Sequence, residues 1–447
     1  ESTVDTLLNW GTMGGVISNA GTIGNVTNAQ GGLTAGGSLG PLSLTGAMFT
    51  GDYVAHITST THYGQFAFVD GNGVLKSFNL TPDSVLKKGT YQDVLAGITS
   101  INGPLSGTAG RALWTLLADP SIAGTWDLAV ILLGPDVANT LLELGYSRDE
   151  VLTALRNRAA LMNNALATDC SSFGSTGVCL SFDVRRTAMD EERETSGTFA
   201  LGVRLSSKLR AGAFVEVPMS HSSNLHGVHR GDKKPIFGGY LGYSQHDHGD
   251  GLQVRIVGAT NTSEVSITRP NALQDTEAGE GHAQVKSWAL GAELGYGIKL
   301  GAHTRLTPYL GLQRVSVERE AYAETATDTV EYPLSYAAYG QRTTTGRAGA
   351  VLSGKLGEKV HYKLGAGAEF DLKSNSDAYA GTSLIDDLPS FSLANTAPAK
   401  KFRGTGTAEL GYEVLPGVSL SVAASLRGEA FSDKTHASVS GGIRFNF

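Results

Sequence analysis

The sequence predicts an all-β protein whose main part is a 12-stranded antiparallel transmembrane β-barrel, with an N-terminal α-helix through the pore and a β-solenoid with short strands before it. Three observations lead to this prediction. Apolar and polar residues alternate along twelve segments, the connections between these segments are alternately short and long, and an Asn-Gly repeat occurs near the start. Alternation is typical of strands, and loops that are long on one side only are typical of outer-membrane barrels.

Composition and charge exclude several classes of protein. The 447 residues include 58 glycines without a collagen period, and 17% are charged, which favours repetitive β structure. No stretch of about 18 uncharged apolar residues occurs, so a helical membrane protein is excluded, whereas barrel strands need only about 9–11 residues. A net charge of −7 disfavours nucleic acid as a partner. Because H-E-x-x-H and Walker-type motifs are absent, we expect neither an enzyme nor a cofactor.

The first forty residues predict the last rungs of a β-solenoid. "NWGTMG" at 9–14 is echoed by "NAGTIG" at 19–24, and Asn and Gly between single apolar residues suit the tight corners between stacked rungs. Residues 41–134 contain short alternating runs such as "QFAFVD" and "TWDLAVIL", which are separated by turn residues. These runs predict a compact region of short strands that caps the solenoid.

Residues 135–177 predict a linker with a helix at 147–167, "SRDEVLTALRNRAALMNNALA". Ser147 and Glu150 form a capping box, and the segment lacks Gly and Pro. About 20 residues would extend roughly 30 Å. Polar residues spread around the helix place it in water or in a polar cavity rather than in lipid; they are Asp149, Glu150, Arg156, Arg158, Asn163 and Asn164.

The two cysteines, Cys170 and Cys179, predict a small structural disulfide in an oxidising compartment of the cell envelope. A metal site would need a second pair of Cys or His at suitable spacing. His246, Asp247 and His248 occur together, but neighbours on a strand point to opposite faces, so we expect a solvated turn there and no metal.

Residues 178–447 predict the barrel. The expected strands are 178–188, 196–206, 208–218, 234–245, 251–262, 283–299, 303–318, 340–353, 358–373, 403–414, 417–429 and 435–447. In "SWALGAELGYGIKL" the large apolar residues share one face, and Gly, Ser, Glu and Lys share the other, which suits a narrow wet lumen. At 303–318 the pattern breaks, because Arg314 would face lipid while Val315 and Val317 change sides. This indicates either a bulge or a strand that has already left the membrane.

The last strand alternates up to the terminal residue, with Ile443, Phe445 and Phe447 on one face. Chain ends usually fray unless something holds them. A barrel closes only when its last strand pairs with its first, because unpaired backbone groups in lipid cost several kcal/mol each. The alternation therefore predicts that Phe447 belongs to the closing strand, and that both ends of the barrel domain lie on the side of the short turns.

These features together resemble the C-terminal part of a monomeric autotransporter of the type V secretion class in Gram-negative bacteria. "NAGTIG" resembles the late rungs of a β-helical passenger, "GTWDLAVIL" its end, and "LTPYLGL" and "IRFNF" resemble barrel motifs of the family. The resemblance implies a translocator that inserts in outer-membrane lipid and mediates secretion and surface display of its own passenger. Residues 1–40 would then be the last passenger rungs, and residues 41–134 the C-terminal cap of the passenger.

The resemblance also implies partners and site residues. Ile443, Phe445 and Phe447 would form the signal for the outer-membrane β-barrel assembly machinery, and periplasmic chaperones would escort the chain. In one subfamily the passenger is released between two adjacent linker asparagines. Residues around Asn163 and Asn164 do not match that motif, so polar positions that hydrate the pore are the preferred interpretation.

The lumen carboxylates are expected to have one of two roles. Glu293, Glu369 and Glu409 would either pair with Arg156 or Arg158 on the helix, anchoring it by charge-assisted hydrogen bonds, or simply wet the pore.

Two alternative functions explain less of the sequence than a translocator does. A plain porin-like channel leaves the solenoid repeat and the helix unexplained, and a soluble β-solenoid adhesin leaves the lipid-facing rows unexplained.

Overall fold

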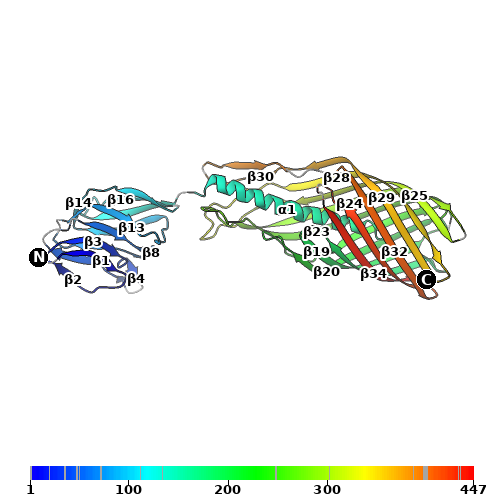
Figure 1. Cartoon of the computed structure of the whole chain (residues 1–447), viewed down its shortest axis with the longest axis horizontal. Coiled ribbons are helices and arrows are strands. Elements are labelled where there is room, and N and C mark those ends of the chain that lie inside the picture. Colours follow the sequence, from blue (N-terminus) through cyan, green and yellow to red (C-terminus); the bar gives the residue numbers. More distant parts are fainter. Residues whose placement is uncertain are drawn as a thin grey trace. The chain divides into compact units, whose positions relative to one another are not determined.

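The computed structural model describes residues 3–19, 21–34, 37–46, 49, 51–70, 73–110, 112–132, 134–246, 249–301, 303–385, 387–395, 401–430, 432 and 434–447. The chain forms two compact units, Glu1–Pro135 and Asp136–Phe447 (Figure 1). Among the described residues, no helix has both the length and the hydrophobicity that a bilayer crossing requires.

The first unit is a stack of short parallel strands with an antiparallel end. Its strands are β1 (Val4–Asn9), β2 (Val16–Asn19), β3 (Ile23–Asn28), β4 (Leu33–Thr34), β5 (Gly37–Ser38), β6 (Leu42–Gly46), β7 (Asp52–Ala55), β8 (Ile57–Ser59), β9 (His62–Tyr63), β10 (Phe66–Phe68), β11 (Gly73–Leu75), β12 (Ser77–Leu80), β13 (Gly89–Ala96), β14 (Ile98–Ile101), β15 (Ser106–Ala109), β16 (Ala112–Ala118) and β17 (Trp126–Leu132). One sheet has the order β1-β3-β7-β12 and a second has the order β2-β6-β10-β13-β17-β16-β15. Pairing is parallel through the first sheet and from β2 to β13 in the second, and then becomes antiparallel.

Parallel stacking of this kind is the geometry of a solenoid, and it extends further than the sequence predicts. A boundary was expected at residue 40, but β7, β10, β12 and β13 continue the parallel stack, and residues 1–135 form one compact unit. The sequence signal stops early because the Asn-Gly repeat marks only the first corners. Later rungs are held by buried aromatic side chains instead, such as Tyr53 and Phe66, whose rings stack at 5.1 Å.

A ladder of buried amides links the first rungs. The Nδ2 of Asn9 donates to the Oδ1 of Asn28 at 2.9 Å. Asn28 has no exposed surface, and its Nδ2 donates to the backbone carbonyls of Gln30 and Gln65 at 2.9 and 2.8 Å. Its Oδ1 also accepts from the backbone N–H of Gln30. Asn28 therefore satisfies several groups that water cannot reach.

We predict that Asn28→Ala destabilises this unit by about 1–3 kcal/mol, because it leaves buried donors and acceptors without partners. Urea unfolding of the full chain, followed by tryptophan fluorescence, measures the change, since Trp10, Trp114 and Trp126 all lie in this unit. The matched control is Asn79→Ala, because Asn79 is exposed and its Nδ2 donates only to Ser77. Equal destabilisation by both substitutions would contradict the role of the ladder.

The second unit begins with one long helix, α1 (Val137–Ala165), whose 29 residues span about 43 Å. Asp136 caps it, and its carboxylate accepts from the N–H of Asn139 at 2.7 Å. The predicted start at Ser147 is wrong. Ser147 is buried inside the helix, and its hydroxyl bonds the Tyr379 hydroxyl at 3.0 Å. Ser147 and Glu150 match a capping box in sequence, but the helix continues through Gly145 toward the N-terminus. Its N-cap is Asp136.

The barrel has twelve strands, as predicted, and it is closed. They are β18 (Val178–Ala188), β19 (Glu192–Arg204), β20 (Leu209–Ser223), β22 (Ile236–Ser244), β23 (Gly251–Thr268), β24 (Glu280–Lys299), β25 (Thr304–Arg319), β28 (Tyr339–Leu356), β29 (Val360–Ser376), β32 (Phe402–Leu415), β33 (Val418–Gly428) and β34 (Thr435–Asn446). Each pairs antiparallel with its neighbours, and β18 pairs with β34 from Cys179 opposite Asn446 to Ala188 opposite Ala437. The N–H of Phe447 donates to the carbonyl of Val178 at 2.8 Å, so the terminal residue is part of the closure.

The connections differ in length at the two ends. At one end they are short, as between β24 and β25 or between β32 and β33. At the other end the long loops form further strands, namely β21 (Val228–Arg230), β26 (Tyr322–Ala323), β27 (Ser335–Tyr336), β30 (Tyr379–Thr382) and β31 (Ser390–Leu393). The last four make a small sheet of their own. In outer-membrane barrels the long loops face the outside of the cell.

Strand β25 contains no bulge where the pattern breaks. Its register with β24 and β28 is unbroken through Val315 and Val317, so the first of the two explanations is wrong. Arg314 points outward, and its guanidinium lies 5.6 Å from the Trp288 ring. The two valines are buried and point inward. The hydrophobic pattern changes sides because something apolar fills the lumen at this level.

Candidate functional site: a plugged pore

The outward face of the barrel is apolar. The side chains Trp288, Leu290, Leu294, Tyr296 and Ile298, which form one outward row on β24, are 40–57% exposed. Phe182, Leu241, Leu310, Leu364, Leu410 and Leu420 extend the same surface over other strands. A surface of this kind requires lipid around it.

The helix α1 fills the end of the lumen that carries the long loops (Figure 1). Val151, Leu155 and Leu161 of α1 are buried in one core with Val285 and Val317 of the barrel wall. The predicted wet lumen is therefore wrong for this half. Each fully buried aliphatic side chain contributes about 1.5–3 kcal/mol, so the plug is held mainly by apolar packing.

Several polar residues of the helix bond the wall. The Glu150 carboxylate accepts from the backbone N–H groups of His226 and Gly227 at 3.1 and 2.5 Å. The Nη2 of Arg158 donates to the Ser263 hydroxyl at 2.8 Å. Each of these contacts joins the helix to a different strand or loop of the wall, which fixes the rotation of the plug.

The two asparagines considered as a cleavage site have separate partners. The Oδ1 of Asn163 accepts from the Nε2 of Gln313, and the Nδ2 of Asn164 donates to the Thr187 hydroxyl at 3.2 Å. Both residues lie within α1, near its C-terminal end.

The three lumen carboxylates Glu293, Glu369 and Glu409 pair with basic residues of the wall. Glu293 pairs with Arg347 at 3.6 Å, and Glu409 pairs with Lys363 at 3.1 Å. The buried Glu369 is surrounded by arginines of neighbouring strands, with N···O distances of 3.2, 3.7 and 2.8 Å to Arg347, Arg403 and Arg427. Pairing with Arg156 or Arg158 was one of the two expected roles, and among the described residues these three carboxylates form no ion pair with either arginine. The sequence could not show this, because strand register decides which lumen charges are neighbours.

Arg156 instead lines a small polar cavity of about 20 Å³ between the plug and the wall, together with Asn163, Gln341, Glu429 and His436. Several side-chain atoms there have no protein partner, including both carboxylate oxygens of Glu429 and both ring nitrogens of His436. A cavity of this size and polarity holds about one water molecule.

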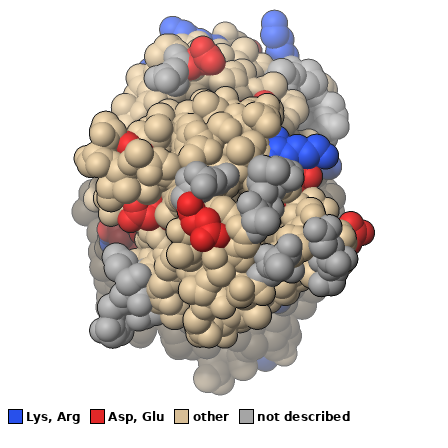
Figure 2. All heavy atoms as spheres, turned by 90° about the vertical axis from the view of Figure 1, so that its left-hand side faces the viewer, with Lys and Arg blue, Asp and Glu red and all other residues tan. Residues whose placement is uncertain are grey.

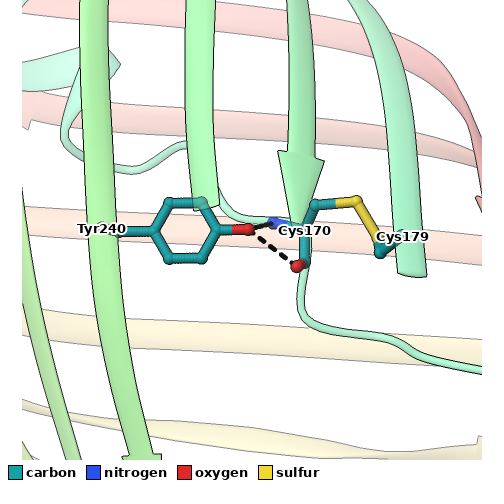
Figure 3. Close-up of a disulfide and its surroundings, with 3 residues drawn as sticks. All are labelled: Cys170, Cys179 and Tyr240. Carbon is teal, nitrogen blue, oxygen red and sulfur yellow. Dashed lines mark hydrogen bonds between the residues drawn. A yellow bond between two sulfur atoms is a disulfide. The ribbon is translucent and has the colours of Figure 1, made fainter. Parts of the chain in front are cut away.

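The linker after the helix is fastened to the wall (Figure 3). Cys170 and Cys179 are joined by a disulfide with a Cα–Cα distance of 5.8 Å. The Tyr240 hydroxyl accepts from the backbone N–H of Cys170 at 3.1 Å and donates to its carbonyl at 2.8 Å. The Nη2 of Arg255 donates to the Thr168 carbonyl at 2.7 Å. The chain that leaves α1 therefore cannot move freely along the lumen.

Below the plug, toward the short turns, the lumen is polar. A cavity of about 690 Å³ opens there, and its lining includes Ser171, Lys299, Arg305, Lys355, Lys363, Glu409, Glu413 and Arg444. The predicted wet lumen is found in this half, where basic side chains outnumber acidic ones. Among the described residues, no three His, Cys, Asp or Glu side chains are grouped to hold a metal; Asp247 and His248 lie outside those residues.

The long loops hold the outer part of the helix through a buried charged cluster that sequence reasoning missed. Arg269 and Glu324 form a bidentate pair at 2.9 and 3.0 Å, and the Tyr336 hydroxyl donates to the same carboxylate at 2.7 Å. Arg319 has no exposed surface, and its guanidinium lies 4.8 Å from the Tyr322 ring and 5.7 Å from the Tyr379 ring. No sequence motif predicts this cluster, because its residues come from separate loops and strands.

We predict that Glu324→Gln loosens the small sheet β26-β27-β30-β31, because it removes the charge of the carboxylate that pairs with the buried Arg269 guanidinium. Removing one partner of a buried pair costs about 3–5 kcal/mol. Hydrogen exchange of the backbone amides of this sheet should accelerate correspondingly. In the matched control, Lys286→Gln breaks the exposed Lys286–Glu320 pair and should change exchange by about 1 kcal/mol or less. Unchanged exchange in Glu324→Gln would contradict the prediction.

The stability of the plug is expected to depend on pH through Glu429. Burial, together with the nearby carboxylate of Asp190, raises the pKa of Glu429 from 4.5 to about 7, while Arg156 and Lys434 oppose the shift. Glu429 lies in the connection after β33. A raised carboxyl pKa stabilises the folded state fully below pH 4.5, and this contribution is lost as pH rises through about 7.

We therefore expect the backbone amides of α1 to exchange hydrogen more slowly at pH 5 than at pH 8, after the exchange rates are corrected for the pH dependence of the intrinsic rate. Glu429→Gln should remove this difference, whereas Glu358→Gln in an exposed short turn should leave it unchanged. The same pH dependence in wild type and Glu429→Gln would show that another group is responsible.

The fold and this site define a class of protein: an outer-membrane β-barrel whose pore is occupied by a segment of its own chain. Residues 185–425, more than half of the chain, match the family model of the autotransporter β-domain. The chain belongs to the autotransporter family, and its barrel is a translocator in the outer membrane. This confirms the resemblance seen in the sequence. The barrel is a transport domain and not a catalytic one.

Several solved structures are similar to this chain. The translocator domain of the autotransporter NalP from Neisseria meningitidis is 20% identical, covering 67% of this chain and 98% of that one, with a TM-score of 0.48. The β-domain of the Bordetella autotransporter BrkA is 14% identical, covering 61% and 99%, with a TM-score of 0.40. The transport unit of AIDA-I from Escherichia coli is 12% identical, covering 65% and 97%, with a TM-score of 0.35. No curated protein matches the sequence.

Proposed function

We propose that residues 1–135 are the C-terminal part of a passenger that this translocator displays at the cell surface, and that α1 is the linker left in the pore after transport. The observation that carries the proposal is the direction of α1. Its first turn lies among the long loops, where the Asn139 Nδ2 donates to the Gln274 carbonyl at 2.9 Å. The chain leaves the lumen at the other end and enters β18 beside Phe447. Residues before Asp136 therefore emerge on the side of the long loops.

The first rung of the solenoid supports the passenger role. β1 and β2 are end strands of their sheets, and Leu8, Trp10 and Val16 on them or between them are 53–61% exposed. Charged side chains are sparse on the face of the molecule shown in Figure 2. An uncovered apolar rung is what a solenoid presents where a further rung stacks, so we propose that upstream passenger rungs continue from this end.

The barrel signal and the asparagines complete the proposal. Ile443, Phe445 and Phe447 lie on the closing strand, where the outer-membrane β-barrel assembly machinery would recognise them after periplasmic chaperones deliver the chain. We propose that the translocator works as a monomer. Asn163 and Asn164 position the plug through Gln313 and Thr187 and do not cleave the chain. A plain channel is disfavoured, because the plug packs against the wall.

Protease treatment of intact cells tests the display of residues 1–135. The epitope belongs at Ser121–Ile122, because both residues are exposed and lie between β16 and β17. We expect protease to remove the epitope from intact cells while the barrel survives. An epitope on the short turn at Glu358 is the control and should stay protected until the outer membrane is permeabilised. Protection of both epitopes in intact cells would place residues 1–135 in the periplasm and contradict the proposal.

A further inference from the structure

The outward face of the barrel carries four cations at one border of its apolar surface. Arg186, Arg314 and Lys373 each follow the last large exposed apolar residue of their strand in the direction of the long loops; those apolar residues are Val184, Leu312 and Leu372. Arg193 lies on the strand next to Arg186, opposite Ala188. All four side chains are exposed. We call them the border cations.

The border cations form two pairs across the sheet. Arg314 stands opposite Thr344 of β28, and Thr344 stands opposite Lys373 of β29. Residues directly opposite in an antiparallel sheet share a face, and two strand spacings amount to about 10 Å. Long side chains can converge over such a gap. Arg186 and Arg193 are diagonal neighbours on β18 and β19, and are closer still.

The border cations lack acidic partners within the part of the chain that the structure describes. Within the described part of the chain, none of the border cations forms an ion pair or a hydrogen bond with a carboxylate. Cations one row further out behave differently, since Lys286 pairs with Glu320, and Arg342 pairs with Glu318 and Asp377. The barrel therefore pairs its outer cations where carboxylates are supplied, and leaves the border cations free for an anion from elsewhere.

The level of the border cations indicates where that anion lies. They stand between the lipid-facing rows and the long loops, and Trp288 beside Arg314 is the kind of residue that sits at a membrane interface. Toward the short turns, the same outward face carries apolar and aromatic residues such as Tyr296, Tyr412 and Leu420. Because the long loops face the cell exterior, the border cations lie level with the headgroups of the outer leaflet.

We propose that the border cations bind the phosphate groups of lipopolysaccharide, the phosphorylated glycolipid of the outer leaflet. Paired cations can hold one phosphate by charge-assisted hydrogen bonds, with apolar neighbours such as Leu312 and Leu372 against its acyl chains. Lipopolysaccharide fits better than a phospholipid, because it presents its phosphates at the outer surface only, where these cations are. Binding there would orient the barrel in the membrane and hold the strands around β25 and β29 together.

Binding of purified lipopolysaccharide to the full chain in detergent tests the proposal. In the variant Arg186→Gln, Arg193→Gln, Arg314→Gln, Lys373→Gln, the apparent Kd should rise about tenfold or more, since each cation near an anionic lipid contributes measurably. The control is Lys286→Gln with Arg342→Gln, which removes paired cations of the same border and should change the Kd by about twofold or less. Dephosphorylated lipopolysaccharide should bind wild type as weakly as the fourfold variant binds the intact glycolipid.

A conservative variant separates charge from folding. Replacing the three arginines with Lys and Lys373 with Arg keeps every charge and should retain binding, and heat-dependent mobility on a gel shows whether each barrel is folded. If the fourfold variant does not fold, the pairs Arg186/Arg193 and Arg314/Lys373 are tested separately with the same expectation. The proposal is overturned if the control weakens binding as much as the border variant does. It is also overturned if phosphatidylglycerol binds as tightly as lipopolysaccharide, with the same dependence on the four residues.

Discussion

The structure depends on the pairing of the first and last barrel strands. In lipid an unpaired backbone N–H or C=O group cannot hydrogen-bond to water, so a β-sheet is stable there only when it has no open edge. The ten-residue ladder between β18 and β34, extended by the Phe447 N–H, removes the edge. This closure explains why the chain keeps strand periodicity to its final residue. It also fixes the circumference of the barrel, and so the width of the lumen that the helix must fill.

The lumen solves two different problems in its two halves. Toward the long loops, α1 and the wall share an apolar core with Val285 and Val317, which fills most of this half of the lumen. Toward the short turns, the wall is lined by Lys363, Arg444 and other polar groups around a cavity of about 690 Å³. A seal made by packing does not require matched charges, which is why Glu369 and its arginines balance one another within the wall rather than across to the helix.

Much of the fold was predictable because it follows from short-range periodicity. Twelve alternating segments and loops of alternating length determine a closed barrel. Most strand ends lie within about three residues of the prediction, and the largest differences, in β19, β20 and β23, are at the long-loop end. The helix start failed because a local match at Ser147 competed with the true cap at Asp136, and both are compatible with helical residues between them. The parallel stack extends past the boundary predicted at residue 40 because aromatic stacking, as of Tyr53 on Phe66, produces no repeat in the amino-acid sequence.

The site was less predictable for a related reason. Which lumen charges meet depends on strand register and barrel closure, and the buried cluster of Arg269, Glu324 and Tyr336 joins loops that lie far apart in the chain. The break in pattern at Val315 was in fact a signal of the plug, since an inward apolar residue in a barrel needs an apolar neighbour inside.

The plug is fixed at both ends by contacts that require the barrel to be complete. At the outer end, Ser147 and Glu143 of α1 bond Tyr379 and the backbone of Leu273, which belong to loops between strands. At the inner end, Cys170 is bonded to Cys179 and held by Tyr240 of the wall. A chain still moving through the pore cannot satisfy both ends at once, because α1 has one length and the two anchors lie at different levels. Under the proposed function, the plugged state is therefore the state after transport, in which the seal and the anchors form together.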